Sequence, residues 1–142
     1  RFPSQLSGVR RHRVSIARTL VHEPSKLLMD EPFGALDAIT LTQIRHDLER
    51  LWLETRKTVL FITHSIEEAV GLSDRVLVMS KSPGTIVDEI KIELPRPRPA
   101  HLGAYPEFAE YARRIYATFE RLGVYNFHRD DKPGGPQPQA AP

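Results

Sequence analysis

The sequence contains no cysteine. This absence excludes disulfide frameworks and thiolate metal sites, and it is common in proteins of the reducing cytoplasm. Long hydrophobic runs are also missing. The apolar stretches are short, such as Val59 to Ile62, whereas a helix that spans a bilayer needs about 20 apolar residues. The chain also lacks a basic start followed by an apolar stretch and a small-residue cleavage site, so no signal peptide is predicted.

The chain has no strong excess of one charge. Its 20 basic and 18 acidic residues give a formal net charge of +2 at pH 7. Such a weak imbalance does not predict nucleic acid as a partner. With 27% charged and 40% hydrophobic residues among 142, the composition is that of one modest globular domain with a core.

Two short apolar runs, residues 26–30 and 58–63, predict strands. Both runs are apolar on both faces, which is typical of parallel strands that are covered on each side. Between them, residues 38–54 are predicted to form a helix, because apolar residues recur at helical spacing in one stripe: Leu41, Ile44, Leu48, Leu51 and Trp52. Strand, helix and strand form a βαβ unit, so we expect an α/β fold with parallel strands and flanking helices.

The sequence after the second strand predicts a helix and then a hairpin. Ser65 with Glu68 three residues later forms a capping box, so a helix is expected to begin directly after the strand. Residues 75–80 and 85–94 are predicted strands joined by the turn Ser82-Pro83-Gly84, and this antiparallel hairpin is expected at the sheet edge. Four apolar residues are expected on one face of the second hairpin strand: Ile86, Ile90, Ile92 and Leu94.

A further amphipathic helix is predicted over residues 106–122. Pro106 suits its first turn, and Gly123 suits its C-terminal cap. Apolar residues at helical spacing form the stripe by which this helix is expected to pack: Phe108, Ala112, Ile115, Phe119 and Leu122.

Composition divides the chain into four parts. Residues 1–94 carry the α/β pattern, and residues 95–105 contain three alternating prolines, which predict a stiff linker. Residues 106–127 form the expected C-terminal helical extension. Residues 128–142 are rich in Pro, Gly and Gln and predict a disordered tail.

Two adjacent carboxylates, Asp30 and Glu31, end the first predicted strand. Ionised groups are costly to bury unpaired, and open α/β sheets bind ligands at the carboxyl ends of their strands. Because side chains alternate along a strand, the two acids are expected to point in different directions. Asp30 is therefore a candidate Mg²⁺ ligand, directly or through water, and Glu31 a candidate general base. The alternative is a solvated strand end with two acids that have no chemical role.

Ser7 and Gly8 precede a basic segment that is expected to be helical, residues 9–18. A serine hydroxyl, a close backbone N–H and the positive end of a helix dipole together suit a phosphate. The alternative is an ordinary helix N-cap with a basic solvated face.

Two further residues lie close to the carboxyl ends of the predicted strands. Asp37 precedes the first helix and is expected to cap it. His64 follows the second strand and is expected to lie level with the two carboxylates. If it faces the same crevice, it can hydrogen-bond a terminal phosphate or orient a water molecule. Otherwise it is a packed or exposed residue without a catalytic role.

These signals occur in an order and a spacing that resemble one family. Leu6-Ser7-Gly8 with Ile16-Ala17-Arg18 is similar to the signature motif of ATP-binding cassette (ABC) proteins, and Leu27 to Glu31 is similar to a Walker B motif with its catalytic glutamate. Ala35-Leu36-Asp37 resembles the D-loop, and Thr63-His64 resembles the motif of the switch histidine. The chain thus resembles the C-terminal half of an ABC-transporter ATP-binding subunit, with a partial P-loop NTPase core.

The resemblance covers residues 2–94 closely. More narrowly, Asp30 to Ala38 resembles importers of nitrate, sulfonate and taurine, and the helix predicted after Pro106 fits that group. The family uses ATP and Mg²⁺. The resemblance therefore implies catalytic roles for Glu31 and His64 and a Mg²⁺ ligand, through water, at Asp30.

The resemblance also implies partners. In the family two ATP-binding subunits associate head to tail around ATP, so Ser7, Gly8 and Asp37 would serve the nucleotide of the second subunit. Hydrolysis would drive an integral-membrane permease, which receives its solute from an extracytoplasmic binding protein. The expected location is therefore the cytoplasmic face of the cell membrane, where the subunit would be held through the permease.

Two departures from the family pattern stand out. The phosphate-binding loop G-x-x-x-x-G-K-[ST] does not occur in the sequence, and this loop makes most phosphate contacts, so the chain alone is expected to be inactive. Val9 stands where the signature usually has a second glycine, and its branched side chain would crowd a phosphate. The alternative function is a non-catalytic truncated product that at most associates with a full-length subunit. A chromosome-organising ATPase head would need long heptad arms, which the sequence lacks.

Overall fold

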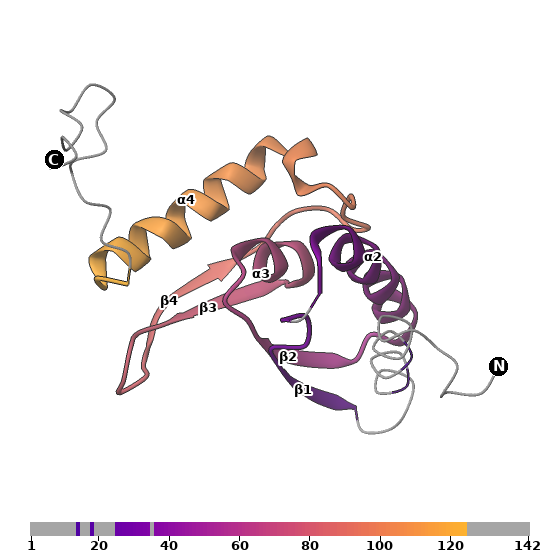
Figure 1. Ribbon diagram of the computed structural model, residues 1–142, viewed down its shortest axis with the longest axis horizontal. Coiled ribbons are helices and arrows are strands. Elements are labelled where there is room, and N and C mark those ends of the chain that lie inside the picture. The colour runs from indigo at the N-terminus through magenta and orange to yellow at the C-terminus, as the bar shows by residue number, and fades with distance from the viewer. Residues whose placement is uncertain (1–13, 15–17, 19–24, 35, 125–142) are drawn as a thin grey trace, which may run out of the picture.

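The structure is a computed structural model that describes residues 14, 18, 25–34 and 36–124 (Figure 1). Ser7, Gly8, Val9 and the predicted tail lie outside the described residues. In chain order the principal elements are β1 (Lys26–Asp30), α2 (Ala38–Thr55), β2 (Thr58–Ile62), α3 (Ile66–Leu72), β3 (Arg75–Met79), β4 (Ile86–Lys91), a 3₁₀ turn η2 (Leu102–Ala104) and α4 (Pro106–Arg121).

The predicted βαβ unit is confirmed. β1 pairs in parallel with β2, with a register that runs from Lys26 opposite Thr58 to Asp30 opposite Ile62. The connection between the two strands is α2, which begins at an aspartate cap and ends where Arg56 adopts a left-handed φ of 53°. The stripe of α2 packs on β1 and the loop after it, forming one core cluster: Leu27, Phe33, Ile44 and Leu48.

Only one face of the β1–β2 sheet is covered by the described part of the chain. Strand alternation directs Leu27 towards α2, whereas Leu28, Leu60 and Ile62 are 69%, 57% and 50% exposed. The prediction that both faces of these strands are covered is therefore wrong for the described structure. A single helix packs on a single face, and no second described layer covers the other.

β3 and β4 form an antiparallel hairpin, as predicted, from Arg75 opposite Lys91. Ile90, Ile92 and Leu94 are buried, but Ile86 is 59% exposed, contrary to prediction. An irregularity between Val78 and Met79 explains the difference: Val78 lies opposite Asp88 and Met79 opposite Ile86, so Val87 has no partner. The extra residue reverses the alternation of side chains in the first part of β4.

The hairpin forms a second two-stranded sheet rather than an edge of the first. Among the described residues, β3 pairs with β4 and β1 with β2, so the predicted attachment of the hairpin to the parallel sheet is not observed. Figure 1 shows α4 running alongside the hairpin with α3 nearby. These elements share the second core cluster: Val70, Val76, Val78, Ile90, Ile92, Leu94 and Ile115.

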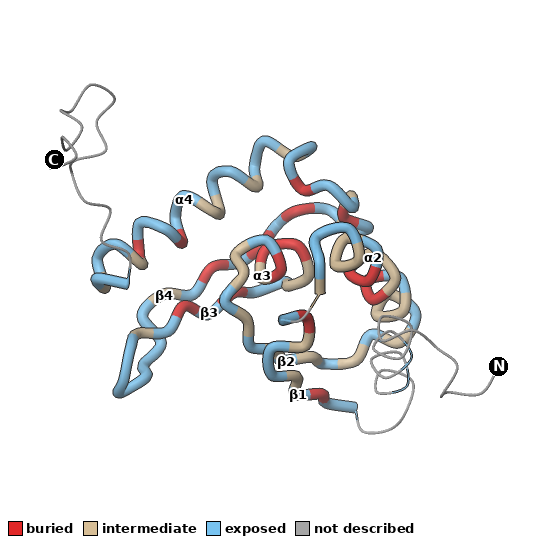
Figure 2. The backbone as a smooth tube through the Cα atoms, viewed as in Figure 1, coloured by how far each residue is buried: buried red, intermediate tan, exposed pale blue. Residues whose placement is uncertain are grey.

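The predicted stripe of α4 is confirmed. Ile115 is 2% exposed, and Phe108 and Phe119 pack against the second cluster, while the opposite face of the helix is largely exposed (Figure 2). Pro106 lies in the first turn, as predicted. Gly123 follows the helix with a φ of 68° and donates its N–H to the carbonyl of Glu120 at 3.0 Å, which is the cap that the glycine predicts.

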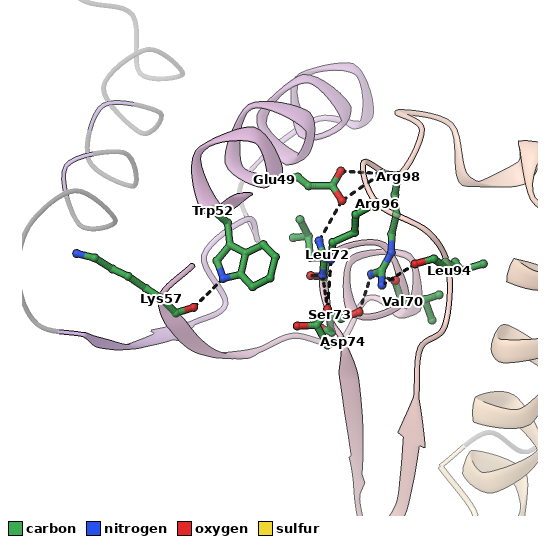
Figure 3. A network of polar contacts seen from close by, with 10 residues as sticks. All are labelled: Glu49, Trp52, Lys57, Val70, Leu72, Ser73, Asp74, Leu94, Arg96 and Arg98. Carbon is green, nitrogen blue, oxygen red and sulfur yellow. Dashed lines mark hydrogen bonds and ion pairs between the residues drawn. The ribbon is translucent and has the colours of Figure 1, made fainter. Parts of the chain in front are cut away.

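The proline-rich segment from residue 95 to 105 lies against α2 and α3 (Figure 3). Arg96 donates to the carbonyl of Leu72 at 2.7 Å, and its guanidinium lies 4.6 Å from the ring centroid of Trp52. Arg98 is 3% exposed and donates to the carbonyls of Val70 and Ser73. No helix in the described part of the chain is long and apolar enough to cross a bilayer.

Candidate functional site

Glu31 lies at the carboxyl end of β1 in an unusual backbone conformation. Its φ is 47°, a left-handed value that is uncommon for a residue other than glycine. The backbone N–H of Glu31 donates to the carbonyl of Ile62 at 2.8 Å, and the carbonyl of Glu31 accepts from Gly34 at 3.3 Å. The end of β2 and the loop before α2 therefore hold this backbone in place.

The structure brings His64 to Glu31. The imidazole Nε2 lies 3.1 Å from Oε1 of the Glu31 carboxylate, and the side chains are 94% and 38% exposed, respectively. The pair forms because the two parallel strands end at the same level, with Asp30 opposite Ile62. The residues that follow both strands therefore lie at the same edge of the sheet. The expectation that His64 lies level with the acids agrees with this geometry. The catalytic roles of both residues remain predictions.

Asp30 is the last residue of β1 and is exposed. Within the described ranges, no group of three or more histidine, cysteine or acidic side chains could hold a metal ion. Magnesium at phosphate sites commonly uses one or two carboxylates, with waters and phosphate oxygens completing the shell. One exposed carboxylate at a strand end fits that pattern, so Asp30 remains the candidate Mg²⁺ ligand.

Asp37 caps α2, as predicted. Its Oδ1 accepts the backbone N–H of Thr40 at 3.0 Å, and its Oδ2 accepts the Thr40 hydroxyl at 2.6 Å. The hydroxyl bond, followed by the backbone bond, lowers the pKa of Asp37 below its ordinary value of 3.8. Asp37 is exposed, so the cap leaves it accessible. Its predicted contact with the nucleotide of a second subunit is a separate matter that stays a prediction.

The turn after β2 contains contacts that the sequence did not predict. Ser65 Oγ accepts the backbone N–H of Glu68 at 3.2 Å, which confirms half of the capping box. The other half differs: the N–H of Ser65 donates to the Thr63 hydroxyl at 3.0 Å, and that hydroxyl donates to the Glu68 carboxylate. Glu68 is buried, and burial raises its pKa above the ordinary 4.5, partly opposed by the Thr63 hydrogen bond. The sequence places a threonine hydroxyl next to His64, but it does not predict that this hydroxyl bonds to Glu68, five residues later.

Comparison with known proteins decides the family. An uncharacterized ABC transporter ATP-binding protein of Methanocaldococcus jannaschii is 49% identical over 80% of this chain and 42% of its own length. The nitrate import ATP-binding protein NrtD of Synechococcus elongatus is 47% identical over 91% of this chain and 47% of its own. The chain belongs to the ABC transporter ATP-binding proteins.

The chain is also 41% identical, over 87% of its residues and 48% of the relative, to the aliphatic sulfonates import ATP-binding protein SsuB of Bacillus cereus. It spans about half the length of the curated relatives that it matches. No protein-family profile matches it.

A solved structure agrees with the α/β fold of this chain. The crystal structure of the complex of the archaeal ribosomal stalk protein aP1 and the archaeal ribosome recycling factor aABCE1 matches with a TM-score of 0.50 and 28% identity. The match covers 63% of this chain and 18% of that chain. The fold is therefore that of a partial P-loop ATPase.

Proposed function

We propose that this chain is part of the ATP-hydrolysing subunit of an ABC importer and carries its hydrolytic base. The observation that supports this most directly is the 3.1 Å contact between His64 Nε2 and Glu31 Oε1 at the carboxyl edge of the parallel strands. A carboxylate with one imidazole contact retains free lone pairs, so Glu31 can accept a proton from an attacking water. His64 orients that carboxylate and, being exposed, can also donate to a developing negative charge.

The other predicted residues complete this proposal. Bound Mg-ATP supplies the phosphoryl group that is transferred to water. Asp30 holds the Mg²⁺ ion from the strand end, through water. Ser7, Gly8 and Asp37 bind the nucleotide of a second ATP-binding subunit. The chain itself contains no phosphate-binding loop sequence, so we propose that the 142 residues alone do not turn over ATP.

The transported solute is proposed from the relatives. One is named for nitrate import and another for import of aliphatic sulfonates. Both are anions with several oxygen atoms on a central nitrogen or sulfur. We propose a solute of this class, a membrane permease as the partner that conducts it and an extracytoplasmic binding protein that delivers it. The subunit then works at the cytoplasmic face of the membrane.

The test uses the chain joined to the part of the Synechococcus nitrate import protein that it does not match. Steady-state phosphate release is measured for this restored protein and for Glu31→Gln, His64→Ala and Glu54→Gln. Glu54 is an exposed acid near the end of α2, so Glu54→Gln controls for the loss of one charge. We expect Glu31→Gln to lower the rate by about 100-fold or more while ATP still binds, because a general base is lost. We expect a similar loss in His64→Ala and none in the control.

Two results would contradict the proposal. If the restored protein binds ATP but does not hydrolyse it, the non-catalytic alternative gains support. If Glu31→Gln and Glu54→Gln hydrolyse ATP as fast as the restored protein, the base lies elsewhere in the subunit.

A further inference from the structure

The exposed pair of Glu31 and His64 needs a fixed backbone to persist. The His64 side chain is 94% exposed. A contact between two exposed side chains contributes little to stability, because its gain is comparable with the entropy lost in holding both side chains in one arrangement. The contact therefore does not position the imidazole by itself. What keeps the two groups together must be the backbone that carries each of them.

The backbone of Glu31 is held by β2. Its N–H donates to the carbonyl of Ile62 at 2.8 Å, directly after the last register pair of the sheet. On the other side, His64 lies between Thr63 and Ser65 in the short turn that joins β2 to α3. The position of the imidazole is therefore determined by whatever fixes Thr63 and Ser65.

A closed set of three hydrogen bonds fixes this turn. The N–H of Ser65 donates to the Thr63 hydroxyl at 3.0 Å, the Thr63 hydroxyl donates to the Glu68 carboxylate, and the N–H of Glu68 donates to Ser65 Oγ at 3.2 Å. The Thr63 hydroxyl accepts one bond and donates another, so its orientation is determined. Both residues that flank His64 are thus tied to the first turn of α3.

Glu68 is the buried anchor of this set. It is 6% exposed, while its neighbour Glu67 is exposed and pairs with Arg45 at 3.0 Å. The cap of α3 is already supplied by the Ser65 hydroxyl. In a reciprocal capping box the Glu68 carboxylate would accept the backbone N–H of Ser65. Here it accepts the Thr63 hydroxyl instead. Its contact is therefore directed at the end of β2 rather than at the end of the helix.

We propose that Glu68 is a positioning residue, which through the Thr63 hydroxyl holds the turn at residues 63–65 and so keeps the His64 imidazole against Glu31. The inference rests on the proposed function, in which that pair acts on the hydrolytic water. Glu68 itself touches neither the nucleotide nor the water in this proposal. It acts through Thr63 and His64.

The first experiment measures the pair directly in the 142-residue chain. Nuclear Overhauser contacts between the His64 ring protons and the Glu31 side chain are recorded by NMR for the wild type and for four variants. Glu68→Ala and Thr63→Val remove the carboxylate and the hydroxyl, and both are expected to lose the contact. Glu68→Gln keeps an oxygen acceptor for Thr63 and is expected to retain it. Glu67→Gln, which changes the neighbouring acid but leaves an oxygen acceptor for Arg45, is the control and is expected to retain it.

The NMR result overturns the proposal if the contact is absent from the wild type, persists in folded Glu68→Ala and Thr63→Val, or disappears equally in Glu67→Gln. Thr63→Val is close to isosteric, so the test remains decisive if Glu68→Ala does not fold. None of these readouts depends on ATP hydrolysis.

The second experiment measures kcat and KM for ATP in the restored protein. Misplacement of a catalytic group by about 1 Å can cost up to about 100-fold in rate, so we expect kcat of Glu68→Ala to fall about 10- to 100-fold with KM for ATP unchanged. Glu68→Gln should recover most of the rate. A purely structural role would instead lower the fraction of folded, active protein. The kcat per folded molecule would then be unchanged in Glu68→Ala, and Glu68→Gln would have no loss of rate to recover.

The two proposals fail separately. If the restored wild-type protein does not hydrolyse ATP, the proposed function fails, and the NMR contacts alone decide whether Glu68 positions His64. If it hydrolyses ATP and Glu31→Gln is inactive, but Glu68→Ala is unchanged in kcat, the function stands and the positioning role is wrong.

Discussion

The carboxylate of Glu49 on α2 accepts the backbone N–H of Arg98 through both of its oxygens, at 3.1 and 3.0 Å, across 49 residues of sequence (Figure 3). Arg96 adds an ion pair to the same carboxylate at 3.0 Å. Glu49 is 4% exposed, so these bonds offset the cost of burying its charge. Through them the proline-rich segment joins α2 to the end of α3.

Removal of the Glu49 carboxylate should therefore be strongly destabilising. Glu49→Ala leaves the N–H of Arg98 without its acceptor and Arg96 without its buried partner, so we expect a loss of about 3–5 kcal/mol in the free energy of unfolding. Urea denaturation followed by circular dichroism measures it. Glu54→Ala, on the exposed side of the same helix, should change the free energy by less than about 0.5 kcal/mol. Equal losses in the two variants would show that the contact between α2 and the segment contributes no more than a surface residue.

Gly71 in α3 has too little room for a side chain unless its neighbours shift. A Cβ at this position would lie 2.8 Å from Leu102 Cδ1 and 3.2 Å from Arg45 Cδ. Overpacking a filled site costs about 1–3 kcal/mol, of which the better helix propensity of alanine recovers up to about 1 kcal/mol. Gly71→Ala should therefore lower the melting temperature. In a Leu102→Ala background the same change should cost less, because only the contact with the Arg45 side chain remains, and a cost that is not reduced there would place the clash elsewhere.

The contact between α4 and β4 should weaken in acid. Asp88 accepts from Arg114 at 2.8 and 3.2 Å, and these bonds lower the pKa of Asp88 below its ordinary value of 3.8. A carboxylate whose pKa is lowered by folding stabilises the folded state above the unfolded pKa, and this contribution disappears as the pH falls through the folded pKa. Asp88→Asn should thus melt at a lower temperature than the wild type near pH 6, and the difference should shrink as the pH is lowered below the ordinary carboxyl pKa of 3.8. A difference that does not change with pH would exclude the ion pair as its cause.

Asp37 allows its structural role to be separated from its proposed role in binding. Asp37→Ala removes both hydrogen bonds to Thr40, so the melting temperature should fall by a few degrees, because the first turn of α2 loses its cap. Asp37→Asn retains a side-chain oxygen and should melt like the wild type. In the restored protein, we expect Asp37→Asn nevertheless to lower ATPase activity through weaker association of the two subunits. Full activity in Asp37→Asn would show that Asp37 caps α2 and has no role in nucleotide binding.

Local chemistry was sufficient to predict several elements. An aspartate before a helical stripe predicts α2 and its cap, and proline and glycine predict where α4 begins and ends, because each of these effects acts within one turn of the chain. The motif residues Asp30, Glu31 and His64 could also be placed at one edge, since parallel strands end level. The family could be recognised for the same reason: its motifs are short and contiguous.

Tertiary structure alone decided the rest. The bulge that exposes Ile86 depends on the partner strand, because register is a property of two segments together. The bond from the Thr63 hydroxyl to the Glu68 carboxylate and the bonds from the Arg98 N–H to Glu49 form only after packing brings these groups together. Neither contact follows from spacing in the sequence. The sequence by itself determined which elements form and which family they belong to. The pairing of β1 with β2 brought Glu31 beside His64, and the burial of Glu68 fixed the turn that carries the imidazole, because only a folded core holds that carboxylate against Thr63.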